Sequence, residues 1–411
     1  MNGFSCFFEP LTQILRVDRT PESIQAGLQT LSTAPFNIVW QALLFHRIAP
    51  AIFVLSGMKE NTPLCYNSPE QKALYCLLNG QYTLSQKRFM LARSLVIQIT
   101  ERLNNVGIQP LWVKGVILAE SLYSDPGMRP FGDLDLIVGP EEYSRAQGAL
   151  SIFQKTEESL RDTAFIANLS SDSDLQIGIE LHNSNGKINY LEHAFEKCLG
   201  INWAQEIEKV YAASVPVESA LGRIRMISKP FMLRFSCIHY TVHLISSFPP
   251  FLWLCDIAFL LNKYRTSLEW NDFPWQIQGT PNPGIENGNP LYLPLLLSSR
   301  WLSAPVSDVS LKNLGTITNR LIQSRAETEA NTFGAVIYGD RHYGLLSYRL
   351  WLSWWQIFQL LLLRVFPSVQ KLKEDGYLNY GTSPIAGYIQ WYRFMFGAHI
   401  KPLLHILFPK H

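Results

Sequence analysis

The sequence predicts an α+β protein in which a small mixed β-sheet lies between two helical regions. The hydrophobic pattern divides the chain into three regions and leads to this expectation. Apolar residues recur at helical spacing up to residue 105, short apolar runs alternate with helical segments from 106 to 230, and helical, aromatic-rich segments follow from 231 to 411. We therefore expect three domains with the bounds 1–105, 106–230 and 231–411.

The composition describes a globular chain with a sizeable core. Of the 411 residues, 47% are hydrophobic and 17% are charged. The formal net charge of +2 lacks the strong positive balance of proteins that bind nucleic acid in bulk, so that class is not indicated. The six cysteines form no CxxC pair, which favours reduced thiols over a disulfide framework or a zinc site.

The N-terminal region reads as helices. The segment 36–55 is apolar at helical spacing and is interrupted by Pro50, and a long pattern from Ser68 to Asn105 shows one apolar residue every three or four positions. Gly107 then stops the helix. The first residues lack a basic segment followed by an apolar core and a cleavage site, so we expect no export signal and a cytoplasmic location.

The central region carries the strands. An apolar run and a Lys-Gly turn lead through a short helix and an Arg-bearing loop to a strand that opens at Gly132 and ends at Val138. A helix is expected to start after Gly139, because proline and two acids follow it. Further strands are expected at 164–169, 175–181 and 222–227.

The C-terminal region is helical again and contains a Pro- and Gly-rich loop at 279–290. The segment 345–366 is the most apolar run. Arg349 and Arg364 bracket it too closely for a membrane span of about 20 uncharged residues. Packing in the core is the expected role, and weak contact with a membrane surface is the alternative.

Acidic residues on two strands point to a metal site. Asp133 and Asp135 are two apart on a strand and face the same way, and two adjacent carboxylates are costly unless a cation lies between them. Glu180 lies on the polar face of another, otherwise apolar strand, where a charged side chain is unfavourable unless it has a partner or a function. Oxygen ligands of this kind suit Mg²⁺ or Mn²⁺, which commonly accompany a nucleoside triphosphate (NTP). The alternative is that these acids face solvent at strand ends.

Other polar residues near these strands fit phosphate binding. Lys114-Gly115 forms a strand-to-helix turn. Gly115 has no side chain, so phosphate can approach its backbone, and Lys114 adds a mobile positive charge. Each of these features has a structural alternative. Lys114-Gly115 could be a simple turn, Arg129 could form a structural salt bridge, and His182 could be a hydrogen-bonded structural histidine. The residues that we assign to nucleotide binding are Lys114, Gly115, Arg129, Gly132 and His182.

Residues elsewhere have structural interpretations. His239 and His243 are four apart, but the acid of a zinc-protease HExxH motif is missing. Asp256 lies in an apolar segment and is expected to satisfy a buried partner, and His46-Arg47 is expected to form a packing contact between helices or domains. Walker A, GxGxxG and GxSxG motifs are absent, which argues against P-loop kinases, Rossmann dehydrogenases and serine hydrolases.

The ordered set Lys114-Gly115, Arg129 and Gly132-Asp133-Leu134-Asp135-Leu136-Ile137-Val138 resembles the polymerase-beta-type nucleotidyltransferase superfamily. More narrowly, it is similar to a bacterial family of uncharacterised nucleotidyltransferases. The segments 46–50, 179–182 and 238–258 resemble that family's "HRV-x-P", "(D/E)-L-H" and "H…H…W-x-x-D-I-A" segments. Lys114-Gly115 replaces the superfamily's usual Gly-Ser, so Lys114 would have to supply the contact to phosphate.

The resemblance implies a small mixed sheet with helices on one face, flanked by helical segments. By it, Asp133, Asp135 and Glu180 are the metal-binding and catalytic carboxylates. We expect a Mg²⁺-dependent enzyme that transfers NMP from an NTP to a hydroxyl or phosphate of an unidentified small molecule, peptide or glycan, in a biosynthetic pathway. The alternative is a catalytically silent binding or scaffold protein, since the Gly-Ser pair is missing.

Overall fold

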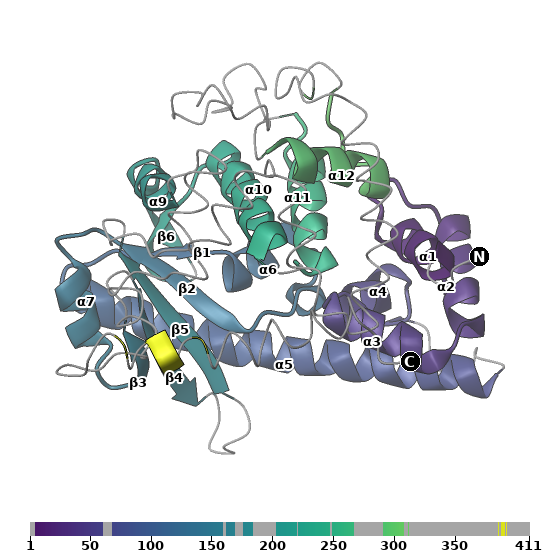
Figure 1. Cartoon of the computed structure of the whole chain (residues 1–411), viewed down its shortest axis with the longest axis horizontal. Helices are drawn as coiled ribbons and strands as arrows, with labels where there is room; N and C mark the ends of the chain where they lie inside the picture. Colours follow the sequence, from purple (N-terminus) through teal and green to yellow (C-terminus); the bar gives the residue numbers. More distant parts are fainter. Residues whose placement is uncertain are drawn as a thin grey trace.

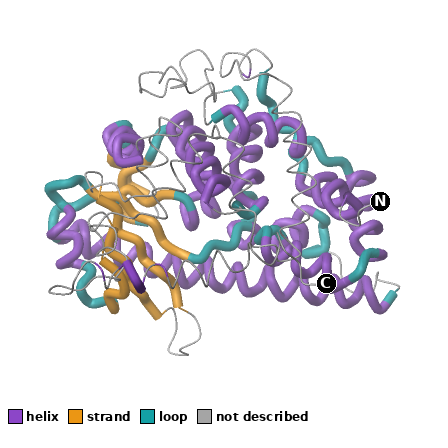
Figure 2. Tube along the Cα trace, in the orientation of Figure 1, coloured by secondary structure: helices purple, strands orange, loops and turns teal. Residues whose placement is uncertain are grey.

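The computed structural model of the chain describes residues 5–60, 68–158, 162–168, 176–183, 203–219, 221–246, 249–266, 291–307, 311, 385, 388–390 and 392. The predicted loop at 279–290 and the apolar segment 345–366 lie outside these residues. In the described part, the strands gather at one end of the molecule, and helices lie beside them and make up the other end (Figure 2).

The N-terminal region is helical. Its helices are α1 (Ser5–Leu15), α2 (Pro21–Thr33), α3 (Phe36–Phe45), α4 (Ala49–Leu55) and α5 (Pro69–Asn105). The apolar segment predicted at 36–55 divides into α3 and α4, and Pro50 lies in the first turn of α4, where its missing N–H costs no hydrogen bond. Ser68 caps α5 by accepting a hydrogen bond from the Gln71 backbone N–H, while the Gln71 side chain bonds back to Ser68.

The central sheet has seven described strands in the order β3-β4-β5-β2-β1-β7-β6. They are β1 (Leu111–Val113), β2 (Asp133–Val138), β3 (Gln154–Glu158), β4 (Asp162–Asn168), β5 (Gln176–Asn183), β6 (Val215–Ser219) and β7 (Gly222–Met226). β2 pairs in parallel with β5 and β1 with β7, while the other pairs are antiparallel, so the sheet is mixed, as the sequence predicts. The polar strand β3 and the exposed, proline-containing strand β6 were not expected from the pattern.

Shorter helices connect and extend the sheet. They are α6 (Gly115–Leu122), the 3-10 turn η2 (Pro126–Met128), α7 (Tyr143–Ala149), α9 (Trp203–Ala212), α10 (Lys229–Ser246), α11 (Phe251–Lys263) and α12 (Tyr292–Leu302). The helix predicted after Gly139 begins at Tyr143, because Pro140 to Glu142 form a turn whose Glu142 side chain accepts from the Gly139 N–H.

The long helix α5 joins the two ends of the molecule. Figure 1 shows it running along the long axis, from behind the strands to the helices α1–α4. At the sheet end, Trp112 of β1 is buried and its indole N–H donates a 3.0 Å hydrogen bond to Thr100 of α5. Buried residues of the helical regions and of the sheet form one continuous apolar cluster. The division into three domains stays a prediction.

None of the described helices combines the length and the hydropathy needed to cross a bilayer.

Candidate functional site

Two parallel strands bring the candidate acids together. β2 and β5 pair in a register that sets Asp135 directly opposite Glu180. Residues opposite each other on paired strands point to the same side of a sheet, and so do residues two apart on one strand. Asp133, Asp135 and Glu180 therefore share one face, while Leu134 and Leu136 are fully buried on the other. The structure places the three acids side by side, and their role stays a prediction.

The turn between β1 and α6 holds Lys114 and Gly115 against these acids. Lys114 adopts a left-handed φ of 55°, which a non-glycine residue tolerates only where its surroundings impose it, at a cost of about 1–3 kcal/mol. A Cβ on Gly115 would lie 3.1 Å from the Asp133 carbonyl oxygen, so a larger residue would press on the β2 backbone. The Lys114 Nζ donates a 2.9 Å hydrogen bond to Asp135 Oδ1.

His182 joins the acids from β5. Its Nε2 lies 3.2 Å from Asp135 Oδ1 and 3.7 Å from Glu180 Oε2. One ligand atom each from Asp135, Glu180 and His182 lies within 4.8 Å of the others, which is compact enough to surround one ion. Asp133 is outside this set of three and lies two residues earlier on the same face of β2.

Electrostatics in this cluster favour a bound cation. Burial and the neighbouring Asp135 raise the pKa of Asp133, and the same two causes raise the pKa of Glu180 to about 7. Burial would also raise the pKa of Asp135, but the charges and hydrogen bonds of Lys114 and His182 hold it well below its usual range. Burial opposes the charged form of Lys114, yet Asp135 outweighs it and raises the lysine pKa. A divalent cation bound among these acids would favour their charged forms.

Arg129 is bound to another acid. Its Nε and Nη2 donate hydrogen bonds of 2.9 and 2.7 Å to the two Asp256 oxygens, and its Nη1 donates to the Gly115 carbonyl. Both side chains are almost completely buried, and Tyr123 also donates to Asp256. Asp256 therefore has the buried partner that the sequence predicts. Arg129 still lines the cavity described below, so a contact with phosphate stays a prediction for its remaining donors.

Gly132 immediately precedes β2. Its carbonyl accepts a 3.0 Å hydrogen bond from Arg88 of α5, and the same nitrogen donates to the Gln176 carbonyl at the start of β5. Arg88 therefore fixes the beginnings of β2 and β5 relative to each other. Gly132 does not line the cavity, and its assignment to nucleotide binding stays a prediction.

A cavity of about 640 Å³ opens over the acids. Its floor is formed by β2, β5 and the Lys114-Gly115 turn, and its walls come from the turn between α3 and α4 and from α10 and α11. The lining residues used below are Arg47, Lys114, Asp133, Asp135, Glu180 and Trp253. Both helical regions therefore complete the space above the sheet.

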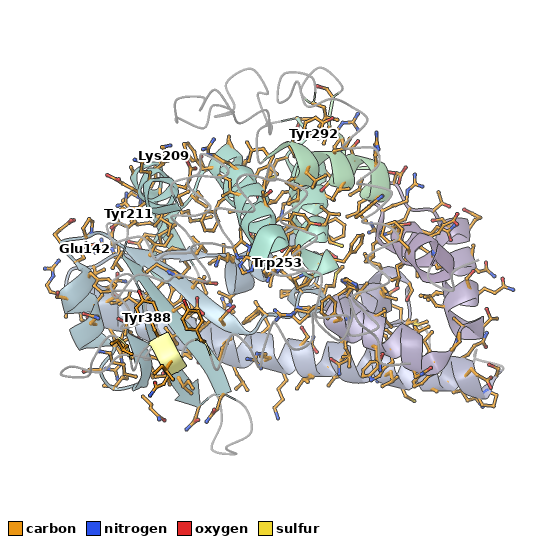
Figure 3. The ribbon with its side chains drawn as sticks, viewed as in Figure 1. Glu142, Lys209, Tyr211, Trp253, Tyr292 and Tyr388 are labelled. Carbon is orange, nitrogen blue, oxygen red and sulfur yellow. The ribbon has the colours of Figure 1, made fainter. Side chains whose placement is uncertain are left out.

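One wall of the cavity is aromatic. His239 and His243 of α10 pack against Trp253 of α11, with ring centroids 4.4 and 4.8 Å from the indole, and the two histidine rings are 4.5 Å apart. Trp253 lies near the centre of the view in Figure 3. Burial lowers the pKa of both histidines, that of His243 to about 4, so the wall is uncharged at neutral pH. Such a surface can stack on a nucleobase or another planar ring.

The sequence interpretation missed the part that Trp253 and Arg47 play in the cavity. Both stand inside the segments that resemble the family, so those segments were the available signal. Their place in the cavity depends on how α3, α4, α10 and α11 pack, and spacing along the chain does not report this.

His46 fixes one corner of the cavity. It is fully buried, its Nδ1 accepts a 3.2 Å hydrogen bond from the Phe251 N–H, and its carbonyl accepts from the Leu252 N–H. These are orphan donors at the start of α11, so His46 caps that helix. This contact between distant helices is what the sequence predicts for His46.

The buried His46 makes stability fall in acid. Burial lowers its pKa from 6.5 to about 3, so the folded state does not bind a proton that the unfolded state takes up below pH 6.5. The His46 contribution is complete above pH 6.5 and decreases as the pH falls towards 3. We expect a loss of roughly 2 kcal/mol between pH 6.5 and 5. Urea unfolding at both pH values should show a smaller loss for His46→Asn than for the unchanged chain, and equal losses would contradict this.

Comparisons with known proteins place the chain in a family. A crystal structure of an antigenic nucleotidyltransferase-like protein from Paracoccidioides brasiliensis is similar at 13% identity and a TM-score of 0.33, covering 54% of this chain and 96% of that chain. No curated protein matches significantly. The sequence model of a family described as "Uncharacterised nucleotidyltransferase" matches residues 40–278, more than half of the chain. This match spans the α3–α4 turn, the sheet and α10–α11, which together surround the cavity. The chain belongs to this uncharacterised nucleotidyltransferase family.

Proposed function

We propose that the protein is an active, metal-dependent nucleotidyltransferase that moves NMP from an NTP to a hydroxyl or phosphate of a small molecule, peptide or glycan. The observation that carries this proposal is the parallel register of β2 and β5, which sets Asp135 opposite Glu180 beneath a cavity. The cationic Lys114-Gly115 turn lies against the same acids. Acids and a phosphate-binding turn in one cavity are what nucleotidyl transfer requires.

The donor set fits a divalent cation. Asp133, Asp135 and Glu180 offer hard oxygen ligands, and His182 adds a nitrogen. The raised pKa values of Asp133 and Glu180 come from burial and from the negative charge of Asp135, and a bound cation would offset both. When bound, Mg²⁺ or Mn²⁺ would neutralise the triphosphate and stabilise charge on its reacting oxygens.

In the transfer step, the residues of the candidate site have separate roles. An oxygen of the acceptor forms a bond to the α-phosphorus, the bond from that phosphorus to the bridging oxygen breaks, and pyrophosphate leaves with the electron pair. Glu180 takes the proton that a hydroxyl acceptor loses. Lys114 and the Gly115 backbone hold the phosphates, and His182 orients the Asp135 carboxylate through their hydrogen bond.

A silent scaffold is the second candidate, and one observation favours it. The ammonium of Lys114 already lies 2.9 Å from Asp135 Oδ1, so a cation of the protein itself holds a proposed metal ligand. A family member that had lost catalysis would be stabilised by such an ion pair.

Calorimetry separates the two candidates. We expect at least one of ATP, GTP, CTP and UTP to bind in the presence of Mg²⁺, and removal of the metal with EDTA to abolish this binding. Absence of metal-dependent binding for all four would leave the scaffold. Mass spectrometry of reactions with labelled NTPs, Mg²⁺ or Mn²⁺ and panels of small molecules, peptides and glycans would then identify the acceptor.

A further inference from the structure

Two cations with unusual backbones line the same cavity. Of the described residues, three that are not glycine have a left-handed φ, namely Arg47 at 56°, Lys114 at 55° and Ser303 at 54°. The two cationic ones both face the cavity over the acids. Two cationic side chains therefore stand on strained backbone positions around one cavity.

The turn that carries Arg47 is held rigidly. The Arg47 N–H donates to the Leu44 carbonyl and the Ile48 N–H donates to the Leu43 carbonyl, which closes the end of α3. His46 binds the same turn to the start of α11 through its side chain and its carbonyl. The position of Arg47 at the cavity is therefore set by two helices and does not depend on a contact of its guanidinium.

The Arg47 side chain has capacity to bind an anion. It is exposed, and within the part of the chain that the structure describes it makes no hydrogen bond or ion pair. The other two cations of the cavity are engaged, Lys114 with Asp135 and Arg129 with Asp256. A triphosphate carries about four negative charges, so its terminal phosphates would need a cation that the acids have not already taken.

The location of Arg47 also fits this need. Burial and Asp135 raise the pKa of Asp133, whereas the positive charges of Lys114 and Arg47 act in the opposite direction. Arg47 is thus close enough for its field to reach the first acid of β2. Its planar fork can contact two phosphate oxygens at once.

We propose that Arg47 binds the two terminal phosphates of the NTP and the pyrophosphate that leaves. This inference rests on the proposed function. By this inference, the α3–α4 turn binds substrate in addition to packing against α11.

The test compares Arg47→Gln, Arg47→Lys and the unchanged full-length chain by calorimetry with Mg²⁺ and inorganic pyrophosphate, an NTP, or the matching NMP. We expect Arg47→Gln to bind pyrophosphate and NTP about tenfold more weakly, because a charge-assisted contact is lost, and to bind NMP unchanged. Arg47→Lys should recover part of the loss. Arg223→Gln, which changes an exposed arginine of β7 paired with Glu218, serves as the control and should match the unchanged chain.

A second variant separates binding from stability. Glycine adopts a left-handed φ without strain, so Arg47→Gly should melt no lower than the unchanged chain and still lose pyrophosphate affinity. A purely structural arginine would give a lower melting temperature and unchanged affinity, which would overturn the inference.

The remaining outcomes are also decisive. If the unchanged chain binds Mg²⁺-NTP and Arg47→Gln binds pyrophosphate equally well, the role of Arg47 is wrong and the proposed function stands. If NMP affinity falls as much as pyrophosphate affinity, Arg47 does not recognise the terminal phosphates. If the unchanged chain binds neither NTP nor pyrophosphate, the proposed function itself fails.

Discussion

Replacing Asp135 with asparagine should reduce nucleotidyl transfer by on the order of 10³-fold or more, equivalent to about 4 kcal/mol of transition-state stabilisation. Asp135 is almost completely buried and has Lys114, His182 and Glu180 around it. The amide keeps the shape of the side chain but has lost the negative charge that would bind a metal. Turnover is measured by release of pyrophosphate from the NTP that binds best.

The fold of Asp135→Asn should remain intact. The charges of Asp133 and Glu180 also support the protonated form of Lys114, so the lysine keeps acidic neighbours. Circular dichroism and the melting temperature check this. Glu218→Gln is a matched control, because it makes the same chemical change at an exposed acid of β6 and should retain full turnover. Normal turnover by Asp135→Asn would end the proposal of metal-dependent transfer at this site.

Replacing Asp256 with asparagine should lower the free energy of unfolding by about 3–5 kcal/mol. Arg129 would then remain buried with its positive charge uncompensated, and Tyr123 would lose the charged acceptor of its hydrogen bond. Guanidinium unfolding followed by tryptophan fluorescence measures the change. A loss below 1 kcal/mol would contradict this prediction, because it would mean that water reaches the Arg129 charge.

Two comparisons make this test specific. Asp18→Asn breaks the ion pair with Arg16, whose partners are 53% and 43% exposed, and should cost less than about 1 kcal/mol because water screens both charges. The double variant Arg129→Met/Asp256→Leu removes both buried charges and should recover much of the stability lost by Asp256→Asn. Together they separate the cost of an unpaired buried charge from the cost of a changed side chain.

Much of the fold follows from local pattern. The helical period from Ser68 to Asn105 gives α5, because an apolar residue every three or four positions leaves one face to bury. The alternation around residues 175–181 gives β5 within one or two residues at each end. Strand β3 escaped prediction because its side chains are polar, and β6 because it is short, largely exposed and contains Pro216. Both are strands because β4 and β7 supply hydrogen-bond partners.

Some residues of the candidate site could be predicted from the sequence, and others could not. Residues close in sequence, such as Asp133 with Asp135 or Lys114 with Gly115, could be recognised because strand and turn geometry relate them directly. The sequence also gave two interpretations of Arg129, phosphate binding and a structural salt bridge, and its partner lies 127 residues away. Contacts over such separations depend on packing, so neither the salt bridge with Asp256 nor the place of Arg47 in the cavity follows from spacing.

The sequence by itself determined the long helix α5, the strands β2 and β5, the family, and the residue types available for metal and phosphate, because each of these depends on neighbours along the chain. Only the tertiary structure decided that Glu180 lies opposite Asp135 and that Lys114 and Arg129 are already bound to acids. It also decided that Arg47 is exposed at the cavity and has no ion pair among the residues that the structure describes. The physical reason is that hydrogen-bond register and the pairing of charges are relations in space between segments that lie far apart in the sequence.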